Sequence, residues 1–276
     1  MSTPSFDATA PPLRPLAPPR VAPVALLLVG SGFAALVYEV VWTRQLTYLF
    51  GATLYAVVTV LTAFMGGLAL GAWWWGRRAD RLRRPVMVYG FLELGIAVSA
   101  LAFPAILRAI TPLWSWGYVA FEDQWTLFLA LRMALIGALL LVPTFLMGGT
   151  LPVLLRACAG GGTAGNRAGW LYAANTFGAV AGAYVSGFHL LATLGIRDST
   201  WVAVFANLAV CALALAFDHF REPMMPGETV TPPGAPPPAA VPIPARTALA
   251  VLWLYALSGA LALAYQVLWN RGLIFC

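Results

Sequence analysis

The sequence predicts an all-α polytopic membrane protein, in which a six-helix bundle is followed by a seventh span that starts a second repeat. Three observations support this fold class. Of the 276 residues, 61% are hydrophobic and only 9% are charged, whereas a soluble domain carries about 25% charged residues. Apolar runs recur at lengths that cross a bilayer, which takes about 20 residues per helix. The last apolar run also repeats the first.

The predicted elements follow one another as a tail, a bundle, a linker and a last helix. Residues 1–21 are rich in proline and are expected to form a disordered tail. Residues 22–217 are expected to form the six-helix membrane bundle, and the proline-rich residues 218–247 an extended cytoplasmic linker. Residues 248–276 hold the first helix of a second, truncated repeat. We place the spans near 22–43, 54–76, 86–106, 126–156, 167–194, 199–217 and 248–271.

Proline and small residues indicate how these spans bend and pack. The fourth run is longer than one span requires, and Pro143 and Pro152 predict that it kinks or breaks near its end. Small residues recur at intervals of four in the second and fifth runs, and this spacing lets helix backbones approach closely. We interpret them as packing faces, formed by Gly67 and Gly71 in one run and by Ala174, Gly178, Gly182 and Ser186 in the other.

The basic residues predict the orientation. All 16 are arginines, and with a cytoplasmic N-terminus eleven of them fall on the cytoplasmic side and four on the opposite side. Cytoplasmic loops carry such an excess of positive charge. We therefore expect an integral protein of a bacterial inner membrane, with its N-terminus in the cytoplasm and the lipid bilayer around it.

Cysteine and histidine give no sign of a cofactor. Three scattered cysteines and two histidines provide neither a disulfide framework nor the spacing of a zinc or haem site. We expect no metal, no cofactor, no catalytic residue in this chain and no nucleic-acid partner.

The seventh run is a copy of the first. Residues 31–44 (SGFAALVYEVVWTR) align without gaps on residues 258–271 (SGALALAYQVLWNR), and eight of the fourteen pairs are identical. Shared Tyr, Trp and Arg at fixed spacing indicate a protein built from two similar halves. Because the sequence ends soon after the second copy, we expect a truncated product or part of a longer chain.

Six helices, a cytoplasmic linker and a second copy of the first helix resemble the major facilitator superfamily. Residues 76–84 (GRRADRLRR) are similar to its loop motif, G-x-x-x-D-R-x-G-R-[RK], with Arg83 in place of the second glycine and Pro85 in place of the last basic residue. The resemblance implies that Asp80, Arg81 and Arg84 belong to a cytoplasmic gate. The alternative is that this loop only anchors the chain at the membrane surface.

A closer resemblance is carried by four segments together: 31–44, 63–71 (AFMGGLALG), 145–152 (FLMGGTLP) and 171–182 (LYAANTFGAVAG). They resemble the membrane region of the fused facilitator–spermidine synthase proteins, over nearly the whole chain from Leu26 onward. Full-length members carry an aminopropyltransferase-like domain, which implies polyamine synthesis or handling. No such domain is present in this sequence, since its glycine-rich loop at 160–165 joins two spans and not a strand to a helix. Whether the chain belongs to an enzyme therefore stays open.

Three ionisable residues inside the predicted spans are candidates for function, because charge within a membrane is costly. Glu39 and Arg132 are expected at a similar depth, where they either line a central cavity with Tyr38 and Trp42 or form a structural ion pair. Gln266 replaces Glu39 in the repeat, which favours a binding site. Glu93 is expected either to pair with Arg156 at the inner rim, which we prefer, or to exchange protons.

Two functions remain open at this point. The first is transport or channelling of a polyamine or another small organic cation, which would suit Glu39, Glu93 and the aromatic faces of Tyr38 and Trp42. The second is a non-catalytic membrane scaffold that binds a partner membrane protein or a second copy of the chain, because alternating access requires two halves.

Overall fold

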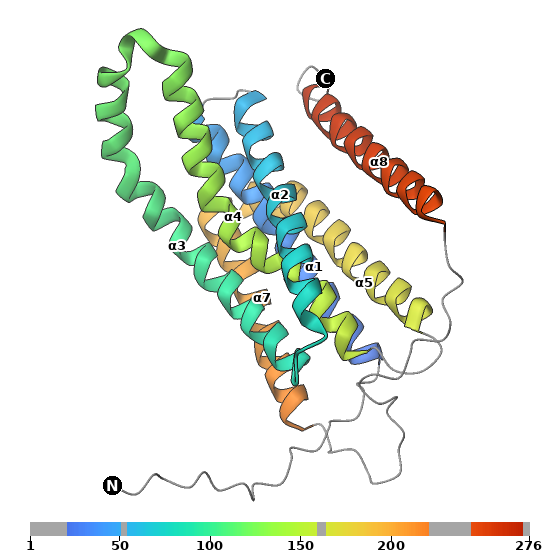
Figure 1. Ribbon diagram of the computed structural model, residues 1–276. Coiled ribbons are helices and arrows are strands. Elements are labelled where there is room, and N and C mark those ends of the chain that lie inside the picture. The colour runs from blue at the N-terminus through green and yellow to red at the C-terminus, as the bar shows by residue number, and fades with distance from the viewer. Residues whose placement is uncertain (1–20, 51–53, 159–163, 221–243, 273–276) are drawn as a thin grey trace, which may run out of the picture.

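The computed structural model describes residues 21–50, 54–158, 164–220 and 244–272, and within these ranges it is helical and contains no strand (Figure 1). The predicted tail, nearly all of the predicted linker and part of the glycine-rich loop lie outside the described residues. The predicted all-α class is confirmed for the described part of the chain.

Seven long helices make up the structure. They are α1 (Val21–Phe50), α2 (Leu54–Ala79), α3 (Pro85–Ala120), α4 (Trp125–Ala157), α5 (Ala164–Val185), α7 (Gly195–His219) and α8 (Ala245–Gly272). A short 3-10 turn, η1 (Glu122–Gln124), joins α3 to α4. A π turn, η2 (Ser186–Leu190), and the short helix α6 (Leu191–Thr193) continue α5. The chain then turns at Gly195, whose φ of 72° lies in the left-handed region that favours glycine.

Six helical stretches are long and apolar enough to cross a membrane, which is consistent with an integral membrane protein. They correspond to α1, α2, α3, α4 with its preceding turn, α7 and α8. The fifth predicted span, 167–194, is not among them. The helix there, α5, is long enough, but Asn175 and several glycines, together with Asn166 and Arg167 near its start, make it less apolar than the other long helices.

The helices α3 and α4 form a hairpin, in which α3 is longer than the predicted span 86–106 and α4 matches the predicted span 126–156 to within one residue at each end. With 36 residues, α3 is about 54 Å long, compared with about 30 Å for the hydrocarbon core of a bilayer. Pro143 and Pro152 lie inside α4, which is nevertheless one continuous helix, so the predicted break is absent. Neighbouring helices in a bundle can stabilise the turn that a proline weakens. Figure 1 shows the hairpin reaching beyond the other helices.

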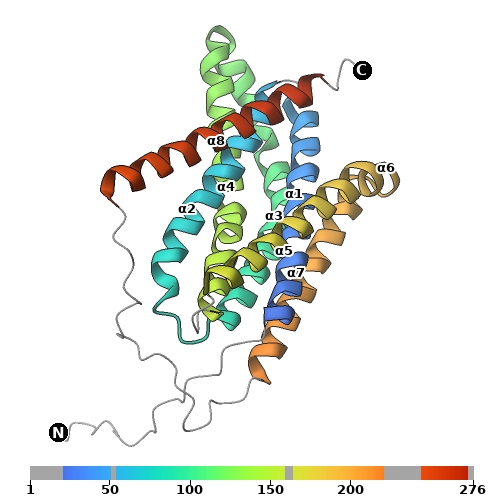
Figure 2. The ribbon, with the colours of Figure 1, turned by 90° about the vertical axis from the view of Figure 1, so that its right-hand side faces the viewer.

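The first six long helices pack as a bundle, whose closest pairs are α1 with α5, α2 with α4, and α3 with α7 (Figures 1 and 2). Further contacts join α3 to α4 and α1 to α7. This pattern has an internal symmetry. Exchanging α1 with α4, α2 with α5 and α3 with α7 leaves this set of five contacts unchanged. The pair α1–α5 becomes α2–α4, the pair α3–α4 becomes α1–α7, and the pair α3–α7 maps onto itself.

Glycine contacts repeat this symmetry at atomic detail. A Cβ atom on Gly32 of α1 would meet the backbone of Asn175 and Ala179 on α5. A Cβ atom on Gly148 of α4 would meet Leu68 and Ala72 on α2. In both cases the two contacted residues flank a second glycine, one lying three residues before it and the other one residue after it. This second glycine is Gly178 on α5 and Gly71 on α2. The small-residue stripes are therefore packing faces, as predicted.

The last helix, α8, lies against the bundle with most of its described side chains exposed. It crosses the view in front of α2 and α4 in Figure 2. Its residue Gln266 reaches Glu39 of α1.

Candidate functional site

The first candidate site lies where α1 meets α8. Glu39 is 8% exposed, and its Oε1 accepts a hydrogen bond of 3.4 Å from Nε2 of Gln266. Gln266 is the residue that aligns with Glu39 in the sequence repeat. The structure therefore brings the two equivalent positions of the repeat together. The contact is a single hydrogen bond between the two repeated helices, and the side chain of Gln266 is otherwise exposed.

The predicted partner of Glu39 lies elsewhere. Arg132 donates from Nη2 to the backbone oxygen of Leu49 at 2.6 Å, and its guanidinium lies 5.4 Å from the centre of the Trp114 ring. No ion pair joins it to Glu39 among the described residues. The depth estimate failed because α1 continues to Phe50 and the α3–α4 hairpin reaches further out than a single span. Leu49 lies ten residues beyond Glu39, about 15 Å along the helix.

The two aromatic candidates beside Glu39 lie in the core of the bundle. Tyr38 and Trp42 are 0% and 1% exposed, and their rings stack at 5.1 Å. Trp42 also packs against Phe103 of α3 at 5.3 Å. In this structure they support α1 from inside the bundle, while the carboxyl group of Glu39 faces α8.

The second candidate site is a buried polar group between α3 and α7. Glu93 is fully buried, and its Oε2 accepts a hydrogen bond of 2.5 Å from Nδ2 of Asn207. The hydroxyl group of Tyr89, one turn before Glu93 on α3, donates to the backbone oxygen of Leu27 at 3.0 Å. Within ordinary hydrogen-bond geometry, Oε1 of Glu93 and Oδ1 of Asn207 have no partner among the described residues. The carboxyl group of Glu93 is therefore buried with an amide as its side-chain partner.

The predicted pair of Glu93 with Arg156 is wrong. Arg156 faces Asp80 instead, with 3.4 Å between Nε and Oδ1. Eight residues into α3, Glu93 lies in the apolar interior, and the nearest strong donor is on α7. The preference for a rim pair assumed that the carboxyl group would turn towards the aqueous end.

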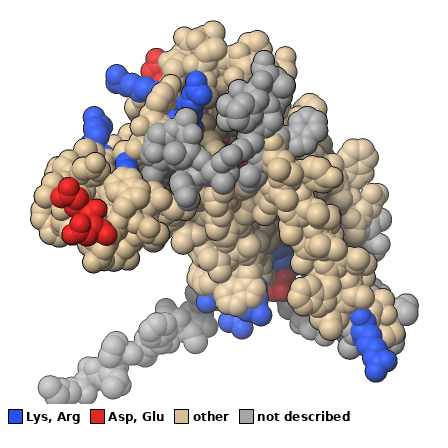
Figure 3. All heavy atoms as spheres, turned by 90° about the horizontal axis from the view of Figure 1, so that it is seen from above, with Lys and Arg blue, Asp and Glu red and all other residues tan. Residues whose placement is uncertain are grey.

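The loop between α2 and α3 holds the gating candidates. Asp80 is exposed and contacts Arg156 of α4, while Arg84 forms an ion pair of 2.7 Å with Asp218 at the end of α7. Arg81 is exposed, and no ion pair is recorded for it in the described ranges. The loop therefore connects the end of α2 to α4 and the start of α3 to α7. Opposite this end, Figure 3 shows few charged side chains on a largely uncharged surface.

Two residues of these polar contacts were missed in the sequence analysis. Asn207 is a polar side chain in the middle of an apolar run, and Asp218 stands at the end of the same run. A search for polar residues inside spans, and not only for charged ones, would have found Asn207.

Comparisons of the chain with protein family models, with curated proteins and with solved structures found no match.

Proposed function

We propose that this chain is part of a facilitator-like membrane carrier of two similar halves, which moves a small organic cation of the polyamine class. The observation that carries the proposal is the contact between Glu39 and Gln266. Carriers built from repeats hold their substrate at the interface between the repeats. A carboxyl group placed at that interface is the group that an ammonium ion would meet.

The architecture supports this proposal. Six helical stretches have the length and apolar composition of membrane spans. In addition, α5, η2 and α6 together form a helical segment of 30 residues that packs beside α1. The symmetric exchange of the first three long helices with the next three is the inverted repeat expected inside each half of a facilitator. We propose that the arginine-rich end, with the N-terminus, faces the cytoplasm of a bacterium.

The chemistry of the interface favours a cation. Glu39 is largely buried, and its recorded side-chain partner, Gln266, is a neutral amide. A buried carboxylate gains most from a partner that carries positive charge. The polyamine class comes from the resemblance to the fused synthase proteins.

A binding experiment tests the proposal. The chain is reconstituted in nanodiscs and titrated with radiolabelled spermidine and putrescine. Loss of a charge-assisted hydrogen bond costs about 1.5–3 kcal/mol, so we expect Glu39→Gln to weaken binding at least tenfold. Glu122→Gln removes a carboxylate from the exposed tip of the α3–α4 hairpin and should leave binding unchanged. Gln266→Glu should strengthen it, because it adds a second carboxylate.

The alternative of a non-catalytic scaffold predicts a different outcome. A scaffold would bind neither amine above the background of empty nanodiscs, and Glu39→Gln would change nothing. Proteoliposomes that contain the complete protein would then also show no spermidine uptake. Such results would exclude the carrier and favour a role in holding a partner membrane protein.

A further inference from the structure

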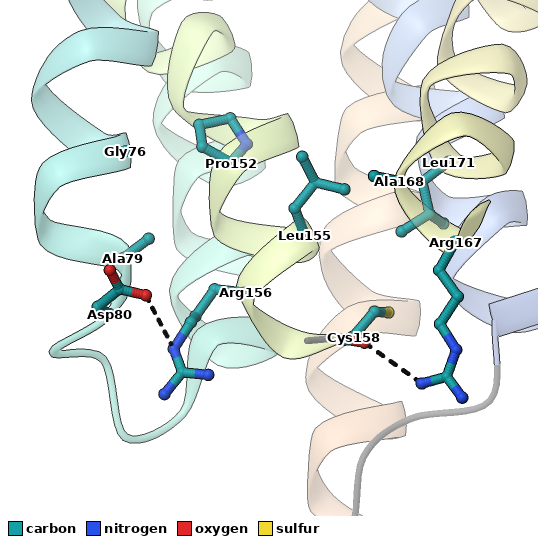
Figure 4. A pocket seen from close by; sticks show the side chains of 10 residues that line it. All are labelled: Gly76, Ala79, Asp80, Pro152, Leu155, Arg156, Cys158, Arg167, Ala168 and Leu171. Carbon is teal, nitrogen blue, oxygen red and sulfur yellow. Dashed lines mark hydrogen bonds and ion pairs between the residues drawn. The ribbon is translucent and has the colours of Figure 1, made fainter. Parts of the chain in front are cut away.

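A cleft opens at the arginine-rich end of the bundle, between the α2–α4 pair and α5 (Figure 4). Its volume is about 320 Å³. The wall is apolar and includes Pro152 and Leu155 of α4 and Leu171 of α5. The guanidinium groups of Arg156 on α4 and Arg167 on α5 lie at the same end of the cleft, on opposite sides of its mouth. The cleft is thus amphipathic, with a positive mouth and an apolar interior.

The ion pair of Arg156 is long and exposed. Nε of Arg156 lies 3.4 Å from Oδ1 of Asp80, whose side chain is 86% exposed. Nη1 of Arg167 donates to the backbone oxygen of Cys158 at 3.4 Å. An exposed ion pair contributes little to stability. A phosphate group can therefore replace Asp80 as the partner of Arg156 at small cost, and a guanidinium suits phosphate geometry.

The neighbouring aromatic residues place the cleft at the level of lipid headgroups. Arg77 lies over the ring of Trp73 at 4.3 Å, and Arg78 over Trp74 at 3.7 Å, one turn from the cleft residue Gly76. Tryptophan side chains concentrate at the interface between hydrocarbon and water. This placement uses the membrane part of the proposed function, but it does not depend on transport.

We infer that this cleft binds an anionic phospholipid. The phosphate takes the place of Asp80 beside Arg156, Arg167 adds positive charge on the opposite side of the mouth, and one acyl chain follows the apolar wall along Leu155 and Leu171 towards the bilayer. Basic pockets between membrane helices on the cytoplasmic side have this chemistry. A soluble phosphate would use the two arginines but would leave the apolar wall without a partner, so the lipid is the better fit.

Native mass spectrometry of the chain in a neutral detergent tests the inference, with phosphatidylglycerol as the probe, phosphatidylcholine as the zwitterionic control and glycerol 3-phosphate as the soluble phosphate. We expect phosphatidylglycerol to bind most tightly. Each arginine near the surface contributes about fivefold to the affinity for an anionic lipid, so Arg156→Gln with Arg167→Gln should weaken binding about 30-fold. Arg81→Gln with Arg83→Gln removes equal charge from the exposed loop and should weaken it far less.

Two further variants keep the result interpretable if the double glutamine variant folds poorly. Arg156→Lys with Arg167→Lys preserves the charge and should retain the preference for phosphatidylglycerol. Asp80→Asn removes the competing carboxylate and should tighten binding by a few-fold. The inference would be overturned if the double glutamine variants of the cleft and of the loop lost affinity equally, or if phosphatidylcholine bound as tightly as phosphatidylglycerol. It would also be overturned if Asp80→Asn weakened binding, or if glycerol 3-phosphate competed fully with the lipid. Because no polyamine is present, these outcomes are independent of the carrier test.

Discussion

At the residue scale, the central feature is that polar side chains inside the bundle are paired with uncharged partners. Glu93 contacts Asn207, and Glu39 contacts Gln266. Both ion pairs recorded within the described ranges lie at the arginine-rich end, at Arg84 and Arg156. A charged group near water stays solvated, whereas burying it in an apolar interior costs free energy. The chain therefore separates ion pairs at its end from hydrogen-bonded carboxyl groups in its interior.

This separation leads to a prediction for Glu93. A carboxyl group that is buried without a cationic partner is best accommodated in its neutral form, and glutamine has nearly the same size and hydrogen-bonding groups. We therefore expect Glu93→Gln to leave the melting temperature of the purified chain within about 2 °C of the wild type. Glu93→Ala removes the acceptor for Asn207 and leaves a cavity, so it should destabilise the chain by about 2–4 kcal/mol.

The comparison of the two variants identifies the state of the carboxyl group. Melting can be followed by circular dichroism in the same detergent, with Glu122→Gln as a control at an exposed site. If Glu93→Gln is as damaging as Glu93→Ala, then the group is held as a carboxylate, and the neutral pairing with Asn207 is wrong.

At the scale of elements, helix pairs pack through glycine where two backbones come close. Gly71 faces the backbone oxygen of Phe145 on α4, so an added methyl group would force α2 and α4 apart. On the same helix, a Cβ atom on Gly66 would meet no atom within 4 Å. The same substitution thus has opposite consequences at two positions five residues apart.

We expect Gly71→Ala to lower the melting temperature and Gly66→Ala to leave it unchanged or raise it. Overpacking at a close contact costs about 1–3 kcal/mol, whereas alanine is better than glycine in a helix interior by about 0.5–1 kcal/mol. Thermal unfolding of both variants in one detergent measures the difference. A drop of equal size at Gly66 would show that helix propensity or lipid contact, and not the α2–α4 contact, controls the effect.

Much of the element scale could be predicted from the sequence, and the failures have physical causes. Hydropathy located the long helices, and spacing located the packing faces. Hydropathy located the long α4 but could not show that α3 continues to Ala120, because helix propensity does not stop where apolar composition ends. For the same reason the depth of Arg132 was misplaced and its pairing with Glu39 failed. Partners such as Asn207 depend on which helices pack together, which no single run of sequence contains.

At the scale of the whole molecule, two levels of repetition coincide with the two polar contacts. The exchange of α1, α2 and α3 with α4, α5 and α7 maps the pair α3–α7 onto itself, and Glu93 meets Asn207 within that pair. The sequence repeat relates α1 to α8, and Glu39 meets Gln266 between them. Both polar contacts therefore join helices that one of the two repeat patterns relates to each other.

The contact between α1 and α8 provides a prediction for the arrangement of the repeated helices. In a chain whose native cysteines are replaced by serine, Glu39→Cys and Gln266→Cys should be linked efficiently by a short bifunctional thiol reagent, because their side chains meet at 3.4 Å. Tyr255→Cys with Glu39→Cys is the matched control, since Tyr255 lies eleven residues earlier on α8, about 16 Å along the helix. Mass spectrometry of the digested chain identifies the linked peptides. Equal linking of both pairs would mean that α8 slides along α1. Gln266 would then not define the position of the interface, and the carboxyl group of Glu39 would belong to the surface of a single half.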